Sequence, residues 1–408
     1  MNLEQVTMKL EQYGQEHLLR YMDELPARER ESLCSQIMEN DFSVLGHIHE
    51  SAPSQGREVI SPIRAMTLEE IAENRRTYLE KGAEAIRAGR VGAVLLAGGM
   101  GTRLGSDNPK GMYDIGLTKP VFIFQRIIEN LFQVVDETKS WIHLFIMTSD
   151  KNHQATTGFF QEKNYFGYDR NHIHFFKQDM APAADYQGKI YLEGKAKLAS
   201  SPNGNGGWLT SLKNAGLLDL IHREGIEWLN VFAVDNVLQR IADPCFIGAT
   251  IDQGCDVGAK VVRKNHPDEK VGVMCLKDGH PSIIEYYELT EQLRDTLDEK
   301  GEPAYNFGVI LNYLFHVESV ESIMEKSLPL HVVEKKIPYL DESGILQKPE
   351  EPNGYKFETL ILDVIQLLDK CLPFEVEREK EFAPIKNKTG VDSVESAREL
   401  LKKNGISL

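Results

Sequence analysis

The 408-residue sequence predicts an α/β fold built around a mixed, mostly parallel sheet. Short apolar runs recur through the middle of the chain, and helix-like stretches separate them. The first of these runs, residues 92–97, opens into glycines, as expected of a strand that is buried on both faces. Because strands that alternate with helices form βαβ units, we expect a ligand at the carboxyl ends of these strands.

Local patterns predict the individual elements in order. Before residue 90, apolar residues at helical spacing predict helices, and Thr67 with Glu70 forms a capping box for a helix that ends near residue 88. A turn-rich segment at 51–56 predicts a linker. Strands are predicted at 92–97, 142–147, 172–176, 229–234, 259–262, 271–275 and 283–287, and further helices at 120–135, 209–224 and 393–403.

These patterns divide the chain into three parts. We expect a helical N-terminal region at 1–90, a catalytic domain at 91–318 and a small C-terminal domain at 319–408. The N-terminal helices carry no motif of their own, so we expect them to serve in packing.

Composition excludes several classes of protein. The net charge of −16 disfavours general binding to nucleic acid or anionic lipid. No apolar run approaches the roughly 18 residues of a membrane span, and the N-terminus lacks the apolar core of a signal peptide. The five cysteines are scattered without a C-x-x-C pair, which suits a reducing compartment. We therefore expect a cytoplasmic, monomeric or weakly homo-oligomeric protein with no nucleic-acid or membrane partner.

The most informative segment is the glycine-rich loop at 95–111. Glycines allow a backbone to approach a ligand closely, and consecutive amides can then face phosphate oxygens. Arg103 can form a fork with two oxygens, while Lys110 supplies a compact charge. The glycine spacing G-x-G-x-x-x-G is one residue too long for a dinucleotide fingerprint, and Lys110 stands too far from Gly105 for a Walker A loop. The loop predicts a phosphate-bearing ligand of another kind.

A family resemblance begins in this loop. The run Leu-Ala-Gly-Gly-Met-Gly-Thr-Arg-Leu-Gly, followed by Pro-Lys-Gly at 109–111, resembles the signature of eukaryotic-type UDP-N-acetylglucosamine pyrophosphorylases. The resemblance implies a Rossmann-like, glycosyltransferase-A-like nucleotidyltransferase core. It also implies catalytic roles for Arg103 and Lys110, and nucleotide-binding roles for Leu96, Ala97, Gly98 and Gly99.

Two further segments match nucleotide-binding motifs of that family. The segment Phe-Phe-Lys-Gln-Asp-Met-Ala-Pro ends at residue 182, and its glutamine, Gln178, is the one that reads the uracil edge in the family. A side-chain amide offers the donor and the acceptor that this edge requires. In Pro-Asn-Gly-Asn-Gly-Gly at 202–207, the resemblance places Gly204 against the base and Asn205 on the sugar.

Asp235 follows the apolar run at 229–234. A carboxylate at the carboxyl end of a strand, beside a triphosphate, is well placed to hold Mg²⁺ together with phosphate oxygens and waters. The resemblance implies the same role for Asp235 as nucleotide-binding residue and metal ligand, with Mn²⁺ as a possible substitute. The competing interpretation is an aspartate that only caps the next turn.

The remaining matches concern the sugar and its phosphate. The resemblance assigns sugar contacts to Gly272, Glu285 and Asn306, and catalytic phosphate contacts to Lys356 and Lys386. A carboxylate such as Glu285 can accept two hydroxyl hydrogen bonds at once.

The resemblance implies that UTP and N-acetylglucosamine 1-phosphate form UDP-N-acetylglucosamine and pyrophosphate. Phe307 stands where the family has a small residue, and Leu360 and Leu362 stand where the N-acetylglucosamine enzymes tend to carry phenylalanine. Glucose 1-phosphate or galactose 1-phosphate is therefore an alternative substrate. A non-catalytic sensor of nucleotide sugars is a minor alternative.

Overall fold

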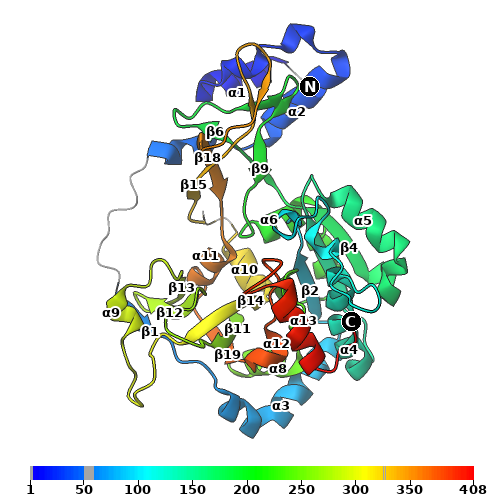
Figure 1. The fold of residues 1–408 in the computed structure, drawn as a ribbon, viewed down its shortest axis with the longest axis vertical. Helices are drawn as coiled ribbons and strands as arrows, with labels where there is room; N and C mark the ends of the chain where they lie inside the picture. Colours follow the sequence, from blue (N-terminus) through cyan, green and yellow to red (C-terminus); the bar gives the residue numbers. More distant parts are fainter. Residues whose placement is uncertain (1–2, 50–58, 325, 327) are drawn as a thin grey trace. The chain divides into compact units, whose positions relative to one another are not determined.

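The computed structural model describes residues 3–49, 59–324, 326 and 328–408. Contacts group the chain into two compact units (Figure 1). Unit 1 draws on Met1–Arg57, Asp179–Gly207 and Leu328–Ile361, and unit 2 draws on Glu58–Gln178, Trp208–Ser327 and Leu362–Leu408. Each unit is built from three separate segments, because the chain passes repeatedly from one unit to the other. The domain boundaries expected near residues 90 and 318 stay predictions. The linker expected at 51–56 lies outside the described residues.

Unit 1 combines the N-terminal helices with small antiparallel sheets. Its helices are α1 (Leu3–Tyr13) and α2 (Ala27–Glu39). Its strands are β5 (Met180–Pro182), β6 (Ala184–Asp185), β7 (Leu192–Gly194), β8 (Lys197–Leu198), β9 (Ser200–Pro202), β15 (His331–Lys335), β16 (Tyr339–Leu340), β17 (Leu346–Gln347) and β18 (Gly354–Glu358). Leu10 and Leu33 of the two helices share a buried core with Ile190, Leu192 and Leu340. The helices thus serve in packing, against strands that lie far away in the sequence.

Unit 2 contains a ten-stranded sheet with the order β1-β12-β14-β10-β2-β3-β4, while β13 pairs with β12, and β11 pairs with β14 and β19. The strands are β1 (Ile60–Pro62), β2 (Val91–Leu96), β3 (His143–Thr148), β4 (Ile173–Lys177), β10 (Trp228–Ala233), β11 (Val257–Arg263), β12 (Val273–Lys277), β13 (His280–Ile284), β14 (Phe307–His316) and β19 (Cys371–Glu375). Strands β10, β2, β3 and β4 run parallel to one another, whereas β14 is antiparallel to β10. Every residue of β2 is buried. The predicted α/β fold with a Rossmann-like mixed sheet is confirmed.

Helices cover this sheet and mostly follow the predicted pattern. They are α3 (Leu68–Arg87), α4 (Ile123–Thr138), α5 (His153–Glu162), α6 (Trp208–Asn214), α7 (Leu218–Glu224), α8 (Pro244–Asp252), α9 (Glu291–Arg294), α10 (Val317–Ser322), α12 (Arg378–Glu381) and α13 (Val394–Lys403), while α11 (Ile361–Gln366) begins at the boundary between the units. The capping box of Thr67 and Glu70 is present as predicted. The single helix predicted for 209–224 is wrong: it is two helices, because Gly216 adopts a left-handed φ of 73° between them. Within the described ranges, no helix has the length and apolar character to cross a bilayer.

Candidate active site

One edge of the unit 2 sheet collects the polar residues predicted for the nucleotide. Leu96 at the end of β2 pairs with Ala233 at the end of β10 and with Met147 near the end of β3. The segments that follow these parallel strands therefore emerge side by side. Strand β14 runs antiparallel to β10 and so begins at the edge where β10 ends. This register brings the glycine loop next to the segment that carries Asp235.

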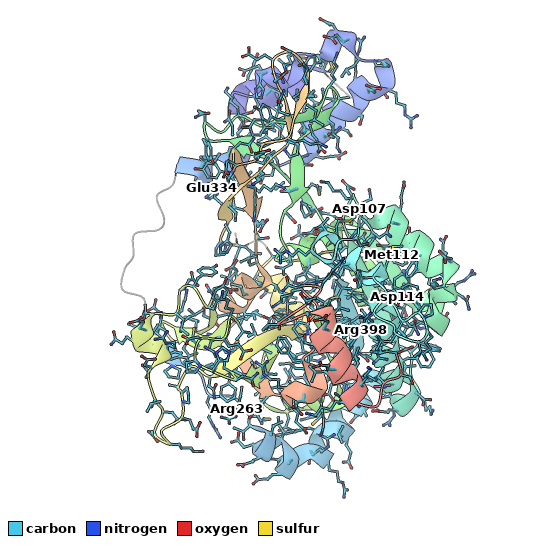
Figure 2. The ribbon with its side chains drawn as sticks, in the orientation of Figure 1. Asp107, Met112, Asp114, Arg263, Glu334 and Arg398 are labelled. Carbon is cyan, nitrogen blue, oxygen red and sulfur yellow. The ribbon has the colours of Figure 1, made fainter. Side chains whose placement is uncertain are left out.

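The glycine loop is closed by its own backbone. The amide of Gly101 donates to the carbonyl of Asn108 at 2.8 Å, and the amide of Lys110 donates to the carbonyl of Gly99 at 3.2 Å. Asp107 lies in this loop and Met112 directly follows it, and Figure 2 labels both residues. The fully buried Asn152 braces its first turn, because its side-chain Nδ2 donates to the carbonyl of Ala97 at 2.9 Å. Sequence reasoning missed Asn152; its signal was a polar cluster just after the strand predicted at 142–147.

A lysine and a carboxylate meet at this edge. Lys110 Nζ lies 3.5 Å from Asp235 Oδ2, and both side chains are largely buried. Burial lowers the pKa of Lys110, the neighbouring Asp235 opposes that shift, and the charges of Lys386 and Arg103 add to it. The charges of Lys386 and Arg103 thus act on the lysine that is paired with Asp235. Such a group is suited to a ligand that carries several negative charges.

Lys386 reaches this group through the backbone. The amide of Ile385 donates to the carbonyl of Asp235 at 3.0 Å, which fixes the neighbouring Lys386 close to the end of β10. The Lys386 ammonium forms an ion pair with Asp392 at 3.0 Å. A polyanionic ligand would therefore compete with Asp392 for this lysine, and sequence reasoning did not identify Asp392.

Gln178 directly follows β4, which lies two strands from β2 along the same edge. The backbone N–H of Gln178 donates to the carbonyl of Thr148 at 2.8 Å, and the Gln178 side chain is buried. A Cβ atom on Gly98 would lie 2.8 Å from Gln178 Oε1, which is closer than real Cβ contacts allow. The glycine at position 98 therefore leaves room for the Gln178 amide beside the loop. The sequence-predicted nucleotide residues of unit 2 come together here.

The sugar-binding residues predicted in unit 2 gather where β12, β13 and β14 meet. Gly272 precedes β12 and accepts a hydrogen bond at 2.9 Å from the amide of Val309 in β14. The pairing of Val273 with Ile284 places Glu285, the next residue, beside Gly272. Asn306 immediately precedes β14, and its Oδ1 accepts from the amide of Lys264 at 3.2 Å.

Gly204, Asn205 and Lys356 belong to unit 1. Asn205 Oδ1 accepts from the amide of Ile361 at 3.0 Å. Lys356 lies in β18, opposite Val333 of β15. The structure describes this unit by itself, so the roles that the resemblance implies for these three residues stay predictions.

Comparison with known proteins decides the family. The family described as UTP–glucose-1-phosphate uridylyltransferase matches residues 48–406. The chain belongs to this family. UDP-N-acetylhexosamine pyrophosphorylase-like protein 1 of Homo sapiens is 37% identical and is aligned over 97% of this chain and 83% of its own length. UDP-N-acetylglucosamine pyrophosphorylase of Saccharomyces cerevisiae is also 37% identical, over 98% of this chain and 86% of its own length.

A solved structure extends the likeness to the fold. The uridine diphosphate N-acetylglucosamine pyrophosphorylase of Trypanosoma brucei, solved with an inhibitor, has a TM-score of 0.82 and 26% identity, covering 98% of this chain and 84% of that one. The resemblance that began in the glycine loop is therefore confirmed at the level of the family. Members of this family are nucleotidyltransferases, so the predicted enzyme class is confirmed as well.

The second glycine motif of this family member gives a first prediction. Gly204 has a φ of 91°, and a Cβ atom on it would overlap the backbone of Thr359. We expect Gly204→Ala to lower the free energy of unfolding by about 3 kcal/mol, because strain and overlap act together. Urea denaturation measures this loss.

The matched control for that prediction is Gly188→Ala, also in unit 1. Gly188 has a φ of 79°, but the nearest atom, in Ile48, would be 3.6 Å away from the new Cβ. Only the backbone cost of about 1–2 kcal/mol applies there. Equal losses in the two variants would contradict the close approach of Gly204 to Thr359.

Proposed function

We propose that the protein transfers the uridylyl group of UTP to N-acetylglucosamine 1-phosphate, forming UDP-N-acetylglucosamine and pyrophosphate. The observation that carries the proposal is the 3.5 Å approach of Lys110 to Asp235, with the charges of Arg103 and Lys386 nearby. Two anionic substrates repel each other, and a group of cations is what brings them together. The name of the yeast relative supports N-acetylglucosamine 1-phosphate as the acceptor, and the name of the human relative supports an N-acetylhexosamine more broadly.

The reaction requires no protein nucleophile. An oxygen of the sugar phosphate attacks the α-phosphorus of UTP, a new P–O bond forms, and the bond to the bridging oxygen breaks. The electron pair leaves on pyrophosphate, and the attacking phosphate is already an anion, so no base is needed. Arg103, Lys110 and Lys386 hold the phosphates in line and offset the charge that builds at the α-phosphorus. Gln178 selects uracil through the donor and acceptor of its amide.

The residues present fit a magnesium ion that is shared with the substrate. Among the described residues, no three His, Cys, Asp or Glu side chains gather as a metal site. Asp235 therefore supplies a single carboxylate, and Mg²⁺ commonly uses one or two carboxylates together with phosphate oxygens and waters. When bound, Mg²⁺ or Mn²⁺ would add positive charge at the triphosphate.

A second candidate acceptor is glucose 1-phosphate or galactose 1-phosphate. Phe307 is only partly buried, and the guanidinium of Arg263 lies 5.2 Å from the centre of its ring. Phe307 directly follows Asn306 and occupies the position at which the family resemblance led us to expect a small residue. A bulky ring at this position favours a sugar without the acetamido group.

Pyrophosphate release distinguishes these candidates. The purified protein is assayed with UTP, Mg²⁺ and each of the three sugar 1-phosphates, and again with Mn²⁺ or without metal. We expect the highest kcat/KM with N-acetylglucosamine 1-phosphate. A higher kcat/KM with glucose 1-phosphate or galactose 1-phosphate would identify that sugar phosphate as the acceptor instead. Tight UTP binding without turnover on any of them would identify a nucleotide-sugar sensor and contradict the enzymatic proposal.

The setting of the reaction is also part of the proposal. The five cysteines form no disulfide, which suits the reducing cytoplasm where nucleotide sugars are made from UTP. The absence of nucleic-acid and membrane partners, and a monomeric or weakly homo-oligomeric state, stay predictions.

A further inference from the structure

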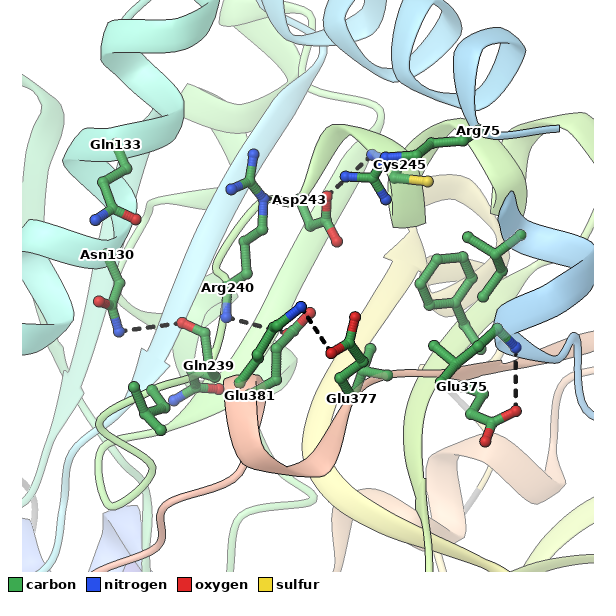
Figure 3. Close-up of a pocket in the computed structure, with 16 residues that line it drawn as sticks. Arg75, Asn130, Gln133, Gln239, Arg240, Asp243, Cys245, Glu375, Glu377 and Glu381 are labelled. Atoms are coloured by element: carbon green, nitrogen blue, oxygen red, sulfur yellow. Dashed lines mark hydrogen bonds and ion pairs between the residues drawn. The ribbon is translucent and has the colours of Figure 1, made fainter. Parts of the chain in front are cut away.

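Lys260 of β11 is a fully buried lysine for which the proposed reaction has no direct use. Its ammonium donates to Glu381 Oε2 at 2.6 Å, to the Arg240 carbonyl at 3.0 Å and to Asp243 Oδ2 at 3.2 Å. All three donors of the ammonium are thus used. Arg240, Asp243 and Glu381 line a cavity of about 310 Å³, and no residue of the glycine loop lines it. Figure 3 labels these three residues on the cavity wall.

An irregularity in the sheet accompanies this burial. The pairing of β11 with β14 shifts register between Ala259 and Val261, so Lys260 falls at the irregularity. Leu311 in the opposite strand has a φ of 52°, which is rare for a residue with a side chain. Irregularities of this kind change the direction in which a side chain points and are frequent beside active sites. The extra residues lie in β14, between Val309 and Tyr313, so the irregularity lies opposite Lys260, whose own strand stays in register with β19.

Hydrogen bonds lead from Glu381 to the candidate active site. The carbonyl of Glu381 accepts from Asn236 Nδ2 at 2.7 Å, and Asn236 Oδ1 accepts from the amide of Ala383 at 2.9 Å. Two residues on, the amide of Ile385 donates to the carbonyl of Asp235 at 3.0 Å. The backbone of residues 381–386 is thereby attached to that of residues 235–240. Lys386 stands at the end of the attached segment.

Electrostatics argue against a purely stabilising role for this ion pair. Burial raises the pKa of Glu381, the charge of Asp243 adds to the rise, and the Lys260 ammonium opposes it. Buried ion pairs often stabilise a protein no better than apolar residues of the same volume would. In some proteins such a pair instead fixes a single arrangement of the groups around it.

We infer that the ion pair of Lys260 and Glu381 is a positioning device that holds Lys386 beside Asp235 and Lys110. The inference rests on the proposed uridylyl transfer, in which Lys386 contacts phosphate. Lys260 touches neither substrate and acts through the backbone of residues 381–386. Its loss should therefore matter only as long as Lys386 is present.

A double-mutant cycle tests this dependence. Lys260→Met and Glu381→Gln are each made alone and combined with Lys386→Ala, and kcat and the KM for UTP are measured. Each single variant is expected to lower kcat about tenfold and to change KM less than about twofold, whereas in the Lys386→Ala background the further loss of kcat is below about twofold. Losses that multiply in the double variants would overturn the inference. Should Lys260→Met not fold, Glu381→Gln carries the test, since it keeps the shape and one acceptor.

Hydrogen exchange provides a readout that does not depend on activity. Deuterium uptake of a peptide covering residues 381–387 should be faster in Lys260→Met and Glu381→Gln than in the wild type. The matched control is Asp256→Asn, which neutralises a partly buried carboxylate that accepts from Ser319 Oγ at 2.8 Å, and it should change neither kcat nor uptake in that peptide. Unchanged uptake in the Lys260 and Glu381 variants overturns the positioning role. An inactive wild type contradicts the proposed function instead, and the uptake comparison then decides the positioning role alone.

Discussion

Replacing Lys110 by alanine is expected to lower kcat for uridylyl transfer by about 100- to 1,000-fold, the loss typical of removing one preorganised charge from a developing anion. Lys110 Nζ lies 3.5 Å from Asp235 Oδ2, and because both side chains are largely buried, their charges are screened less than in open water. Arg103→Ala should change kcat in the same direction. Steady-state release of pyrophosphate measures both losses.

Folding should survive the Lys110→Ala change. The side chain is largely buried, so losing its ion pair should lower the free energy of unfolding by about 1–3 kcal/mol, which is less than the total stability of a typical domain. Lys403→Ala is the control, because Lys403 of α13 forms an exposed ion pair with Glu379 of α12 at 2.6 Å. It should retain full turnover. Near-normal turnover of a folded Lys110→Ala protein would remove the mechanism proposed above.

Asp235→Asn is expected to raise the Mg²⁺ concentration at half-maximal activity by about 10- to 100-fold. The substitution keeps the size of the side chain but removes the negative charge that a divalent cation needs. It also removes the group that opposes the lowering of the Lys110 pKa, so that pKa should fall further. A titration of activity against Mg²⁺ at saturating UTP measures the first effect.

The control for this variant is Asp252→Asn. Asp252 is a partly exposed aspartate at the end of α8, and it pairs with Lys81 at 2.8 Å. Its metal titration should match that of the wild type. If Asp235→Asn also matched the wild type, Asp235 would be a structural residue that only caps the turn after β10.

Local sequence patterns predicted the parallel strands well, because each is a short apolar run bounded by polar or glycine residues. The run at 92–97 corresponds to β2 (Val91–Leu96), and the run at 229–234 corresponds to β10 (Trp228–Ala233). The strand predicted at 283–287 is wrong at its end: β13 ends at Ile284, because a turn begins at Glu285, whose carbonyl accepts from the amide of Glu288. These patterns did not predict the order of the strands in the sheet, because an apolar run does not specify which strand it pairs with.

The sequence by itself indicated the glycine loop, the cations that accompany it and the family, because these depend on residue types at short spacing. Only the tertiary structure decided that Lys110 meets Asp235, since 125 positions along the chain separate them and the parallel pairing of β2 with β10 closes that gap. Only the tertiary structure revealed Lys260 as well, because a lone lysine in an apolar strand carries no sign of the two carboxylates that fold around it. A site formed by residues close together in the sequence can be recognised from the sequence. A site formed by residues of distant strands depends on the order in which the strands pair in the sheet.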